Sequence, residues 1–349
     1  MMDKSKKVGI AGGIAFAYVG TVVGAGFASG QEVMSFFTIY GYKALWAILI
    51  SSFLFTFVGT RILLLGMELK ASSFGKLIDT MFGFLSPVIN IYLLFSMMVI
   101  NMAMLAGAGA MFQEFGKTSY LVGVTITALA AIVTIGFGIS GILSINKILV
   151  SAILSFQIII IVITLFAKNS FEGQINFVEA STIHLIKQGI SYASFNIIFS
   201  TGVLARLGQE FRDRDVLKLG GLLGGSILGA MLLTSHYCLL AHIPYIFDYE
   251  IPVLYIISNK SSFFSILYSL VVWGAIFTTL VGNLFSMTSF FHDRFGINHI
   301  ITATLIVCLA SLLSFLGFSS IVNTLYPIVG LIGVIFIVGI FFYTRKVKK

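Results

Sequence analysis

The sequence predicts an all-α integral membrane protein whose ten transmembrane helices form two halves of five helices each. Three observations support this fold class. Hydrophobic residues make up 58% of the 349 residues, charged residues only 10%, and the mean hydropathy is +1.05. Apolar runs long enough to cross a hydrocarbon core of roughly 30 Å recur along the whole chain. Basic residues divide unevenly between the two sides that such helices would define.

The apolar runs leave no room for a separate soluble domain, so residues 1–349 are predicted to be one transmembrane domain. The two cysteines, Cys238 and Cys308, both fall in apolar runs, which argues against a disulfide framework or a metal site. The runs expected to span the membrane are 8–37, 42–66, 84–113, 119–138, 146–167, 188–211, 216–242, 263–291, 298–316 and 320–343.

The distribution of lysine and arginine predicts the orientation. With the N-terminus in the cytoplasm, 16 of the 21 basic residues lie on the cytoplasmic side and 5 lie outside. This positive-inside pattern predicts a plasma-membrane protein with both termini in the cytoplasm. It also explains the net charge of +8 without a nucleic-acid partner. The external basic residues are Lys43, Lys117, Lys168, Lys187 and Lys260, and the remainder are cytoplasmic.

The stretch "GTVVGAGFASGQE", residues 20–32, places four glycines and a carboxylate inside the first apolar run. Glycine costs a helix about 1 kcal/mol relative to alanine. Unwound backbone within a membrane is tolerated only where it is buried in protein or lines a polar cavity. We therefore predict that the first helix is broken at residues 23–27, near the bilayer centre. Close helix packing through small residues is the alternative.

The sixth run contains a second interruption, "GISYASFNIIFSTG", residues 189–202. The tripeptide Gly30-Gln31-Glu32 also recurs there as Gly208-Gln209-Glu210, 178 residues further on. Because five helices per half invert the second half, we predict an inverted repeat with halves at about 8–167 and 188–343. Both first helices, the first and the sixth of the chain, are expected to be broken at mid-membrane. Paired interruptions of this kind point to the binding site of a transporter.

These residues resemble a known group of proteins. The run from Gly20 to Gly26 resembles the broken first helix of LeuT-fold transporters in the amino acid–polyamine–organocation superfamily. The whole stretch 20–32 is most similar to the YkvI-type group, which is classed with amino-acid permeases. The resemblance implies the LeuT fold and a secondary active transporter. It would import a small zwitterionic solute, an amino acid, by alternating access coupled to a cation.

The eighth run contributes adjacent hydroxyls at its midpoint, Thr278 and Thr279. Sodium-coupled members of the superfamily carry such a pair there. The resemblance therefore implies one cation site made by the carbonyls of Gly20, Val23 and Ala275 and the hydroxyls of Thr278 and Thr279. Five oxygens without a carboxylate suit a monovalent cation, whereas divalent cations prefer carboxylates. Threonines that bond only to their own helix are the alternative.

Thr21 stands where members with a second sodium site have asparagine, which favours a single coupling ion. In proton-coupled members of the superfamily a lysine of the fifth helix can occupy the ion position. Here the only lysine of the fifth run, Lys147, lies at the cytoplasmic end, so the resemblance favours sodium over a proton.

A broken helix exposes N–H groups that can hold a carboxylate, and free carbonyls that can accept from an ammonium group. The first break supplies the N–H groups, and the carbonyls are expected near Ser194–Asn196. Phe27 and Phe195 are candidate gates. The predicted substrate-binding residues are Val23, Gly24, Ala25, Gly26, Phe27, Asn101, Ser194, Phe195 and Asn196.

Three features stay open at this point. Glu32 is expected to hold a neighbouring helix by a hydrogen bond, with cation binding or proton exchange as alternatives. His236 is expected to be a packed neutral histidine, with a proton relay as the alternative. The connection 243–262 is amphipathic enough for a short helical lid, and an interfacial anchor fits equally well.

The sequence contains no HExxH, GxSxG or Walker-type phosphate loop, so we expect neither an enzyme nor an ATP-driven pump. No organic cofactor is expected; sodium is the expected coupling ion, and membrane lipids and a small solute are the expected partners. Two alternative functions remain: a proton-coupled amino-acid permease, and a non-transporting nutrient-sensing receptor of the same fold.

Overall fold

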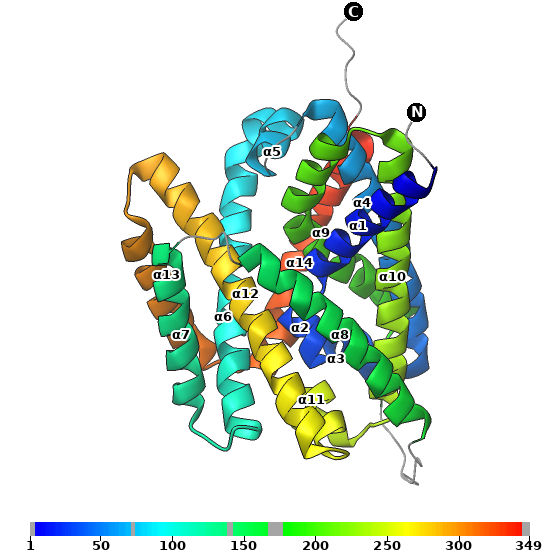
Figure 1. Ribbon diagram of the computed structural model, residues 1–349, viewed down its shortest axis with the longest axis vertical. Helices are drawn as coiled ribbons and strands as arrows, with labels where there is room; N and C mark the ends of the chain where they lie inside the picture. Colours follow the sequence, from blue (N-terminus) through cyan, green and yellow to red (C-terminus); the bar gives the residue numbers. More distant parts are fainter. Residues whose placement is uncertain (1–3, 71–73, 138–141, 167–176, 344–349) are drawn as a thin grey trace, which may run out of the picture.

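The computed structural model describes residues 4–70, 74–137, 142–166 and 177–343, and every regular element in these residues is helical. Figure 1 shows one bundle of long helices with short α2 and α3 near its centre. In chain order the elements are α1 (Lys4–Val22), α2 (Ala25–Ser29), α3 (Gln31–Phe36), η1 (Thr38–Ala44), α4 (Leu45–Leu69), α5 (Phe74–Phe82), η2 (Gly83–Leu85), α6 (Ser86–Glu114), α7 (Tyr120–Phe137), α8 (Ile142–Leu165), α9 (Thr182–Phe211), α10 (Arg214–Leu240), η3 (Tyr245–Asp248), α11 (Pro252–Ser258), α12 (Ser262–Phe295), α13 (His299–Ser314) and α14 (Phe318–Phe342).

The long helices follow the predicted spans in order. Seven described segments are long and apolar enough to cross a membrane. Two shorter apolar segments, Tyr120–Gly136 and His299–Ser314, lie on the fourth and ninth predicted spans. The first predicted span is divided into α1, α2 and α3. The chain is therefore an integral helical membrane protein, while the full set of ten crossings and the inversion of the second half stay predictions.

The two ends of the bundle differ in what they carry. The start of α1 and the end of α14 lie at one end, and α11 lies at the opposite end (Figure 1). Which end faces the cytoplasm stays a prediction from the basic residues. Five of the basic residues lie outside the described residues, namely Lys168, Arg345, Lys346, Lys348 and Lys349. Residue 167, at the end of the first predicted repeat, also lies outside them.

Glycines let the helices of the core approach to backbone contact. A Cβ atom at Gly66 of α4 would overlap the carbonyl of Ala205 in α9. One at Gly208 of α9 would overlap the carbonyl of Leu63 in α4. Such contacts matter in lipid, where helices associate through van der Waals packing at small residues and not through the hydrophobic effect.

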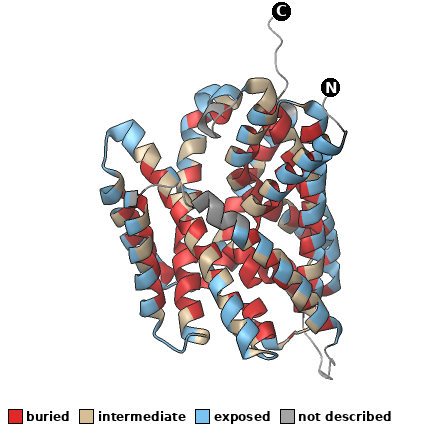
Figure 2. Cartoon of the chain, viewed as in Figure 1, coloured by how far each residue is buried: buried red, intermediate tan, exposed pale blue. Residues whose placement is uncertain are grey.

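The outer faces of the bundle are apolar. Figure 2 shows buried residues along the interior and exposed ones on the outward faces of the helices. Large apolar side chains such as Phe53 (61% exposed), Leu305 (66%) and Ile335 (68%) lie on those outward faces. Water would disfavour such a surface, whereas a hydrocarbon environment accommodates it. The exposure pattern agrees with a bundle surrounded by lipid.

The predicted break of the sixth span is wrong in this structure, because α9 runs without interruption from Thr182 to Phe211. Ser191 donates to the Pro327 carbonyl of α14, and other polar side chains of the interruption bond within α9 instead of unwinding it. Ser194 Oγ donates to the Ile190 carbonyl at 2.7 Å, and Asn196 Nδ2 donates to the Tyr192 carbonyl at 3.1 Å. Such bonds to the preceding turn satisfy a side chain without a gap in the backbone ladder.

Candidate functional site

The first span is interrupted between Val22 and Ala25, within the predicted region. Gly24 is extended (φ −101°, ψ −165°), and its N–H donates to the Val22 carbonyl at 3.0 Å. In a continuous helix that N–H would have bonded to Gly20. The next backbone bond across the gap runs from Ala28 to Gly24, and no side chain caps the start of α2. The break therefore leaves carbonyl oxygens before it and N–H groups after it without helical partners.

A second bend follows at Gly30, which has left-handed backbone (φ 83°) between α2 and α3. Glycine suits this conformation because it has no Cβ. The bend is covered by α11: a Cβ at Gly30 would lie 2.7 Å from Val253 Cγ2. Tyr268 of α12 also donates its hydroxyl proton to the Ala28 carbonyl of α2. Two neighbouring helices thus hold the short segment between the two bends.

The apolar face of α11 is buried against the bundle, with Val253, Leu254, Ile256 and Ile257 all buried. This packing over the second bend favours the lid alternative for residues 243–262 over an interfacial anchor. Whether α11 moves during function stays a prediction.

One of the residues predicted to bind a cation, Thr279 of α12, lies beside the break in the first span. Thr279 Oγ1 of α12 would lie 3.5 Å from a Cβ at Gly24. Thr278 Oγ1 lies 3.3 Å from the Ala275 carbonyl oxygen, to which it donates. This last contact is the in-helix bond that the alternative interpretation expects, so it does not by itself indicate an ion site. Coordination of a cation by these oxygens stays a prediction.

The predicted substrate residues of α9 are only partly brought to the break. Ser194 faces α14, because its Cβ lies 3.4 Å from the Cβ position of Gly333. Phe195 stacks on Tyr326 of α14, with ring centroids 4.3 Å apart. Asn101 of α6 donates to the sulfur of Met287, eight residues beyond Thr279 in α12. That offset is about 12 Å along the helix axis, so Asn101 lies apart from the threonine pair.

A buried polar cluster lies beside the break. Glu32 is 6% exposed, and its carboxylate occupies the space that a Cβ at Gly26 would need. Its Oε2 has no hydrogen-bond partner, and the hydroxyls of Tyr192 and Tyr326 also have none. Tyr192 lies close to the carboxylate, and Tyr326 is within its electrostatic reach. A hydrogen bond from Glu32 that holds the neighbouring helix α9 therefore stays a prediction, with the Tyr192 hydroxyl as the nearby partner.

Sequence reasoning missed three tyrosines, Tyr192, Tyr268 and Tyr326. Each lies in an apolar run where an aromatic residue is ordinary, so only the fold shows that its hydroxyl faces the first span. His236 of α10 pairs Nδ1 with the Thr38 hydroxyl at 3.2 Å, and its Nε2 has no partner. It is 2% exposed, which agrees with a packed histidine, and the proton-relay alternative is untested.

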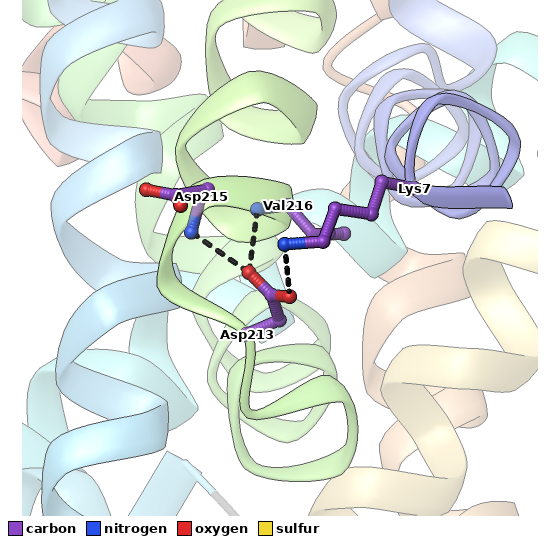
Figure 3. A network of polar contacts seen from close by, with 4 residues as sticks. All are labelled: Lys7, Asp213, Asp215 and Val216. Atoms are coloured by element: carbon purple, nitrogen blue, oxygen red, sulfur yellow. Dashed lines mark hydrogen bonds and ion pairs between the residues drawn. The ribbon is translucent and has the colours of Figure 1, made fainter. Parts of the chain in front are cut away.

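An ion pair at the end of the bundle that carries the termini was also not foreseen. Lys7 Nζ at the start of α1 lies 2.9 Å from Asp213 Oδ2, while Asp213 Oδ1 accepts from the N–H groups of Asp215 and Val216 (Figure 3). The contacts with Lys7 and with the first turn of α10 lower the pKa of Asp213 from its usual value. The pair ties α1 to the connection between α9 and α10.

Solved structures that match this architecture include transporters. The chain matches MhsT in complex with L-phenylalanine with a TM-score of 0.70 and 16% identity, covering 93% of this chain and 87% of that one. It matches inward-facing Mhp1 with a TM-score of 0.64 and 14% identity, covering 93% of this chain and 73% of Mhp1. A Na⁺-coupled sialic acid symporter matches with a TM-score of 0.61 and 13% identity, covering 95% of this chain and 78% of the symporter. At these identities the likeness shows the fold alone: this is an integral membrane protein with the LeuT fold.

Within that class, the chain is similar to YkvI-type membrane proteins over nearly its whole length, as residues 20–32 predicted. It is 29% identical over 337 residues to the membrane protein YkvI of Bacillus subtilis (strain 168), covering 96% of each protein. It is 26% identical over 335 residues to YyaD of the same organism, covering 93% of this chain and 94% of YyaD. No protein-family model matches the chain.

Proposed function

We propose that this protein is a secondary active transporter that imports a small zwitterionic solute, an amino acid, together with a cation, for which sodium is favoured. The observation that carries the proposal is the broken first span lying against α12 at Thr279, one of two adjacent hydroxyl residues of that helix. A bilayer-spanning helix has no structural need for free backbone groups beside hydroxyls. A solute site with an ion beside it does need them.

The substrate would bind at the break. Free N–H groups after Gly24 suit a carboxylate. The unpartnered hydroxyls of Tyr192 and Tyr326 lie near Glu32, beside Gly26, and offer further polar contacts. The stack of Phe195 on Tyr326 supplies an apolar wall for a side chain. MhsT was solved with L-phenylalanine, which makes that amino acid the first probe for this chain.

The cation would bind between the first span and α12. The Gly20 carbonyl has lost its helical donor at the break, and Thr279 faces Gly24 across the gap. Together with Val23, Ala275 and Thr278 these residues offer five oxygens and no carboxylate, which suits a weakly held monovalent cation. Alternating access would proceed in a ten-helix bundle of two inverted halves, with both termini cytoplasmic.

A thermal-shift screen tests this function. Purified full-length protein is heated with each proteinogenic amino acid, L-phenylalanine first, in sodium buffer and in choline buffer. A ligand at about 100 times its Kd should stabilise the folded protein by about 2.7 kcal/mol. We expect a stabilising amino acid whose effect is larger in sodium, because coupling between two sites is reciprocal. If no amino acid raises the unfolding temperature in either buffer, the proposal is wrong.

A further inference from the structure

Glu32 is a buried carboxylate without a counter-ion. It is 6% exposed in a membrane-spanning segment, and it forms no ion pair with any described residue. Its Oε2 has no hydrogen-bond partner. An ionised carboxylate taken out of water costs several kcal/mol unless a cation or several donors compensate it. The environment of Glu32 in this structure therefore disfavours the negative charge.

The packing around Glu32 leaves no space for a metal ion or an ammonium group between its carboxylate and the break. A Cβ at Gly26 would overlap Oε1, Cδ and Cγ of Glu32, so the Glu32 side chain fills the space beside the Gly26 Cα atom. A hydrated or partly hydrated cation needs several oxygens around it and room to sit among them. A proton needs neither, and it is the one positive charge that this packing of the Glu32 carboxylate accommodates.

The elements packed against α3 present neutral groups to this carboxylate. The titratable side chains that act on Glu32 are Tyr192 of α9 and Tyr326 of α14. On α10, His236 is engaged with Thr38, and on η1, Tyr40 is engaged with His184. The segment α2 carries no titratable residue. The lysines and arginines of α9, α10 and η1 lie near the ends of these elements, namely Lys43, Lys187, Arg206, Arg214 and Lys218.

We propose that Glu32 is a proton-binding site at the hinge of the first span: its carboxyl group is protonated in the packed arrangement seen here and ionises when the segment after the break separates from α9 and α14. When the segment packs against α9 and α14, Oε2 of Glu32 takes a proton from water. The O–H group so formed donates to the Tyr192 hydroxyl oxygen. On separation the same proton returns to water.

This inference rests on the proposed transport function and adds a second coupling charge to it. The proton site faces α9 and α14, whereas the proposed sodium ligands lie on α1, at the break and on α12. Each closure of the hinge then takes up one proton, whether or not sodium is bound. A ligand that stabilises one arrangement shifts the population toward it, so acidification favours the packed arrangement.

Infrared spectroscopy of the purified full-length protein at neutral pH tests the site without any substrate. The carbonyl stretch of a protonated carboxylic acid should be present in the wild type and lose the Glu32 component in Glu32→Gln. The control Glu210→Gln, at an exposed position of α9, should leave that component in place. Tyr192→Phe should shift the band without removing it, because the carboxyl group loses its acceptor. A spectrum that Glu32→Gln leaves unchanged in this region overturns the proposal.

The same proteins in the thermal-shift screen separate the two proposals. Glutamine has nearly the shape of protonated glutamic acid, so Glu32→Gln should fold and should remove the pH dependence of amino-acid binding. If the infrared band shows a protonated Glu32 but no amino acid raises the unfolding temperature, the proton site is supported and the transport function is refuted. Sodium-dependent binding without a Glu32 carboxyl band would refute only the proton site.

Discussion

The first span and helix α9 both contain the tripeptide Gly-Gln-Glu, and the structure puts the two copies in different settings. Gly30 adopts a left-handed conformation between α2 and α3, and Glu32 is buried beside the break. Gly208 sits inside continuous α9, packed against the carbonyl of Leu63, and Glu210 is exposed. The same tripeptide lies at a bend in the first span and at a packing contact in α9.

The difference follows from how each helix can satisfy its backbone. The first span has four glycines within residues 20–30, interleaved with β-branched Thr21, Val22 and Val23. Both residue types weaken a helix. In α9 the side chains of Ser194, Asn196 and Thr201 bond to the preceding turn without opening it. Polar content alone is therefore a poorer indicator of a break than clustered glycine.

The largest effect is expected from Gly26→Leu. The new side chain would overlap the Glu32 carboxylate, and overpacking of this kind costs about 1–3 kcal/mol or more. Amino-acid binding should be abolished in the thermal-shift assay while expression is largely retained. Gly282→Leu is the control, because a Cβ at Gly282 meets no atom within 4 Å. Normal binding by Gly26→Leu would remove the basis for a site at the break.

The next effect concerns the hydroxyls of α12. Thr278→Val and Thr279→Val keep side-chain shape but each removes one of about five expected cation ligands. The loss should cost about 1–3 kcal/mol, which is roughly a 5- to 150-fold rise in the sodium needed for half-maximal amino-acid binding.

The matched control for these variants is Thr201→Val in α9, whose hydroxyl donates to the Ile197 carbonyl within its own helix. Sodium titrations of that variant should follow the wild type. If both α12 variants also titrate like the wild type, the hydroxyls serve only their own helix and the cation site is lost from the proposal.

A smaller effect is expected from Ser194→Ala. Its hydroxyl bonds to Ile190 in continuous α9 and its Cβ faces α14. Removing that bond should change amino-acid affinity by no more than about 0.5 kcal/mol, roughly two-fold. The dissociation constant from ligand-dependent thermal shifts checks this. A ten-fold or larger loss would show that α9 opens toward the ligand, as the paired interruptions predicted.

The smallest effect is expected at the ion pair between Lys7 and Asp213, which is partly exposed. Because the pKa of Asp213 is lowered in the folded protein, its contribution to stability is present above the ordinary carboxyl pKa of about 4 and is lost as the pH falls below it. When the unfolding temperature is measured against pH, Lys7→Met should lose less stability than the wild type on acidification. Lys218→Met, at an exposed position of α10, should not.

Much of the first half of the site could be read from residues 20–32, because clustered glycine acts locally on the backbone. The α9 half could not, since Ser194 and Asn196 could either unwind a helix or bond within it. The tyrosines that face Glu32 gave no signal in sequence, because their hydroxyls acquire a role only from what lies across the helix interface.

The sequence by itself determined the membrane class, the order of the long helices and the position of the break, since hydropathy and glycine clustering are local properties. Only the tertiary structure decided that α9 stays continuous, that Thr279 faces Gly24, and that Glu32 is packed over Gly26 beside Tyr192. These contacts join residues far apart in the chain. They depend on how closely two helices approach, which is a property of packing and not of any single segment.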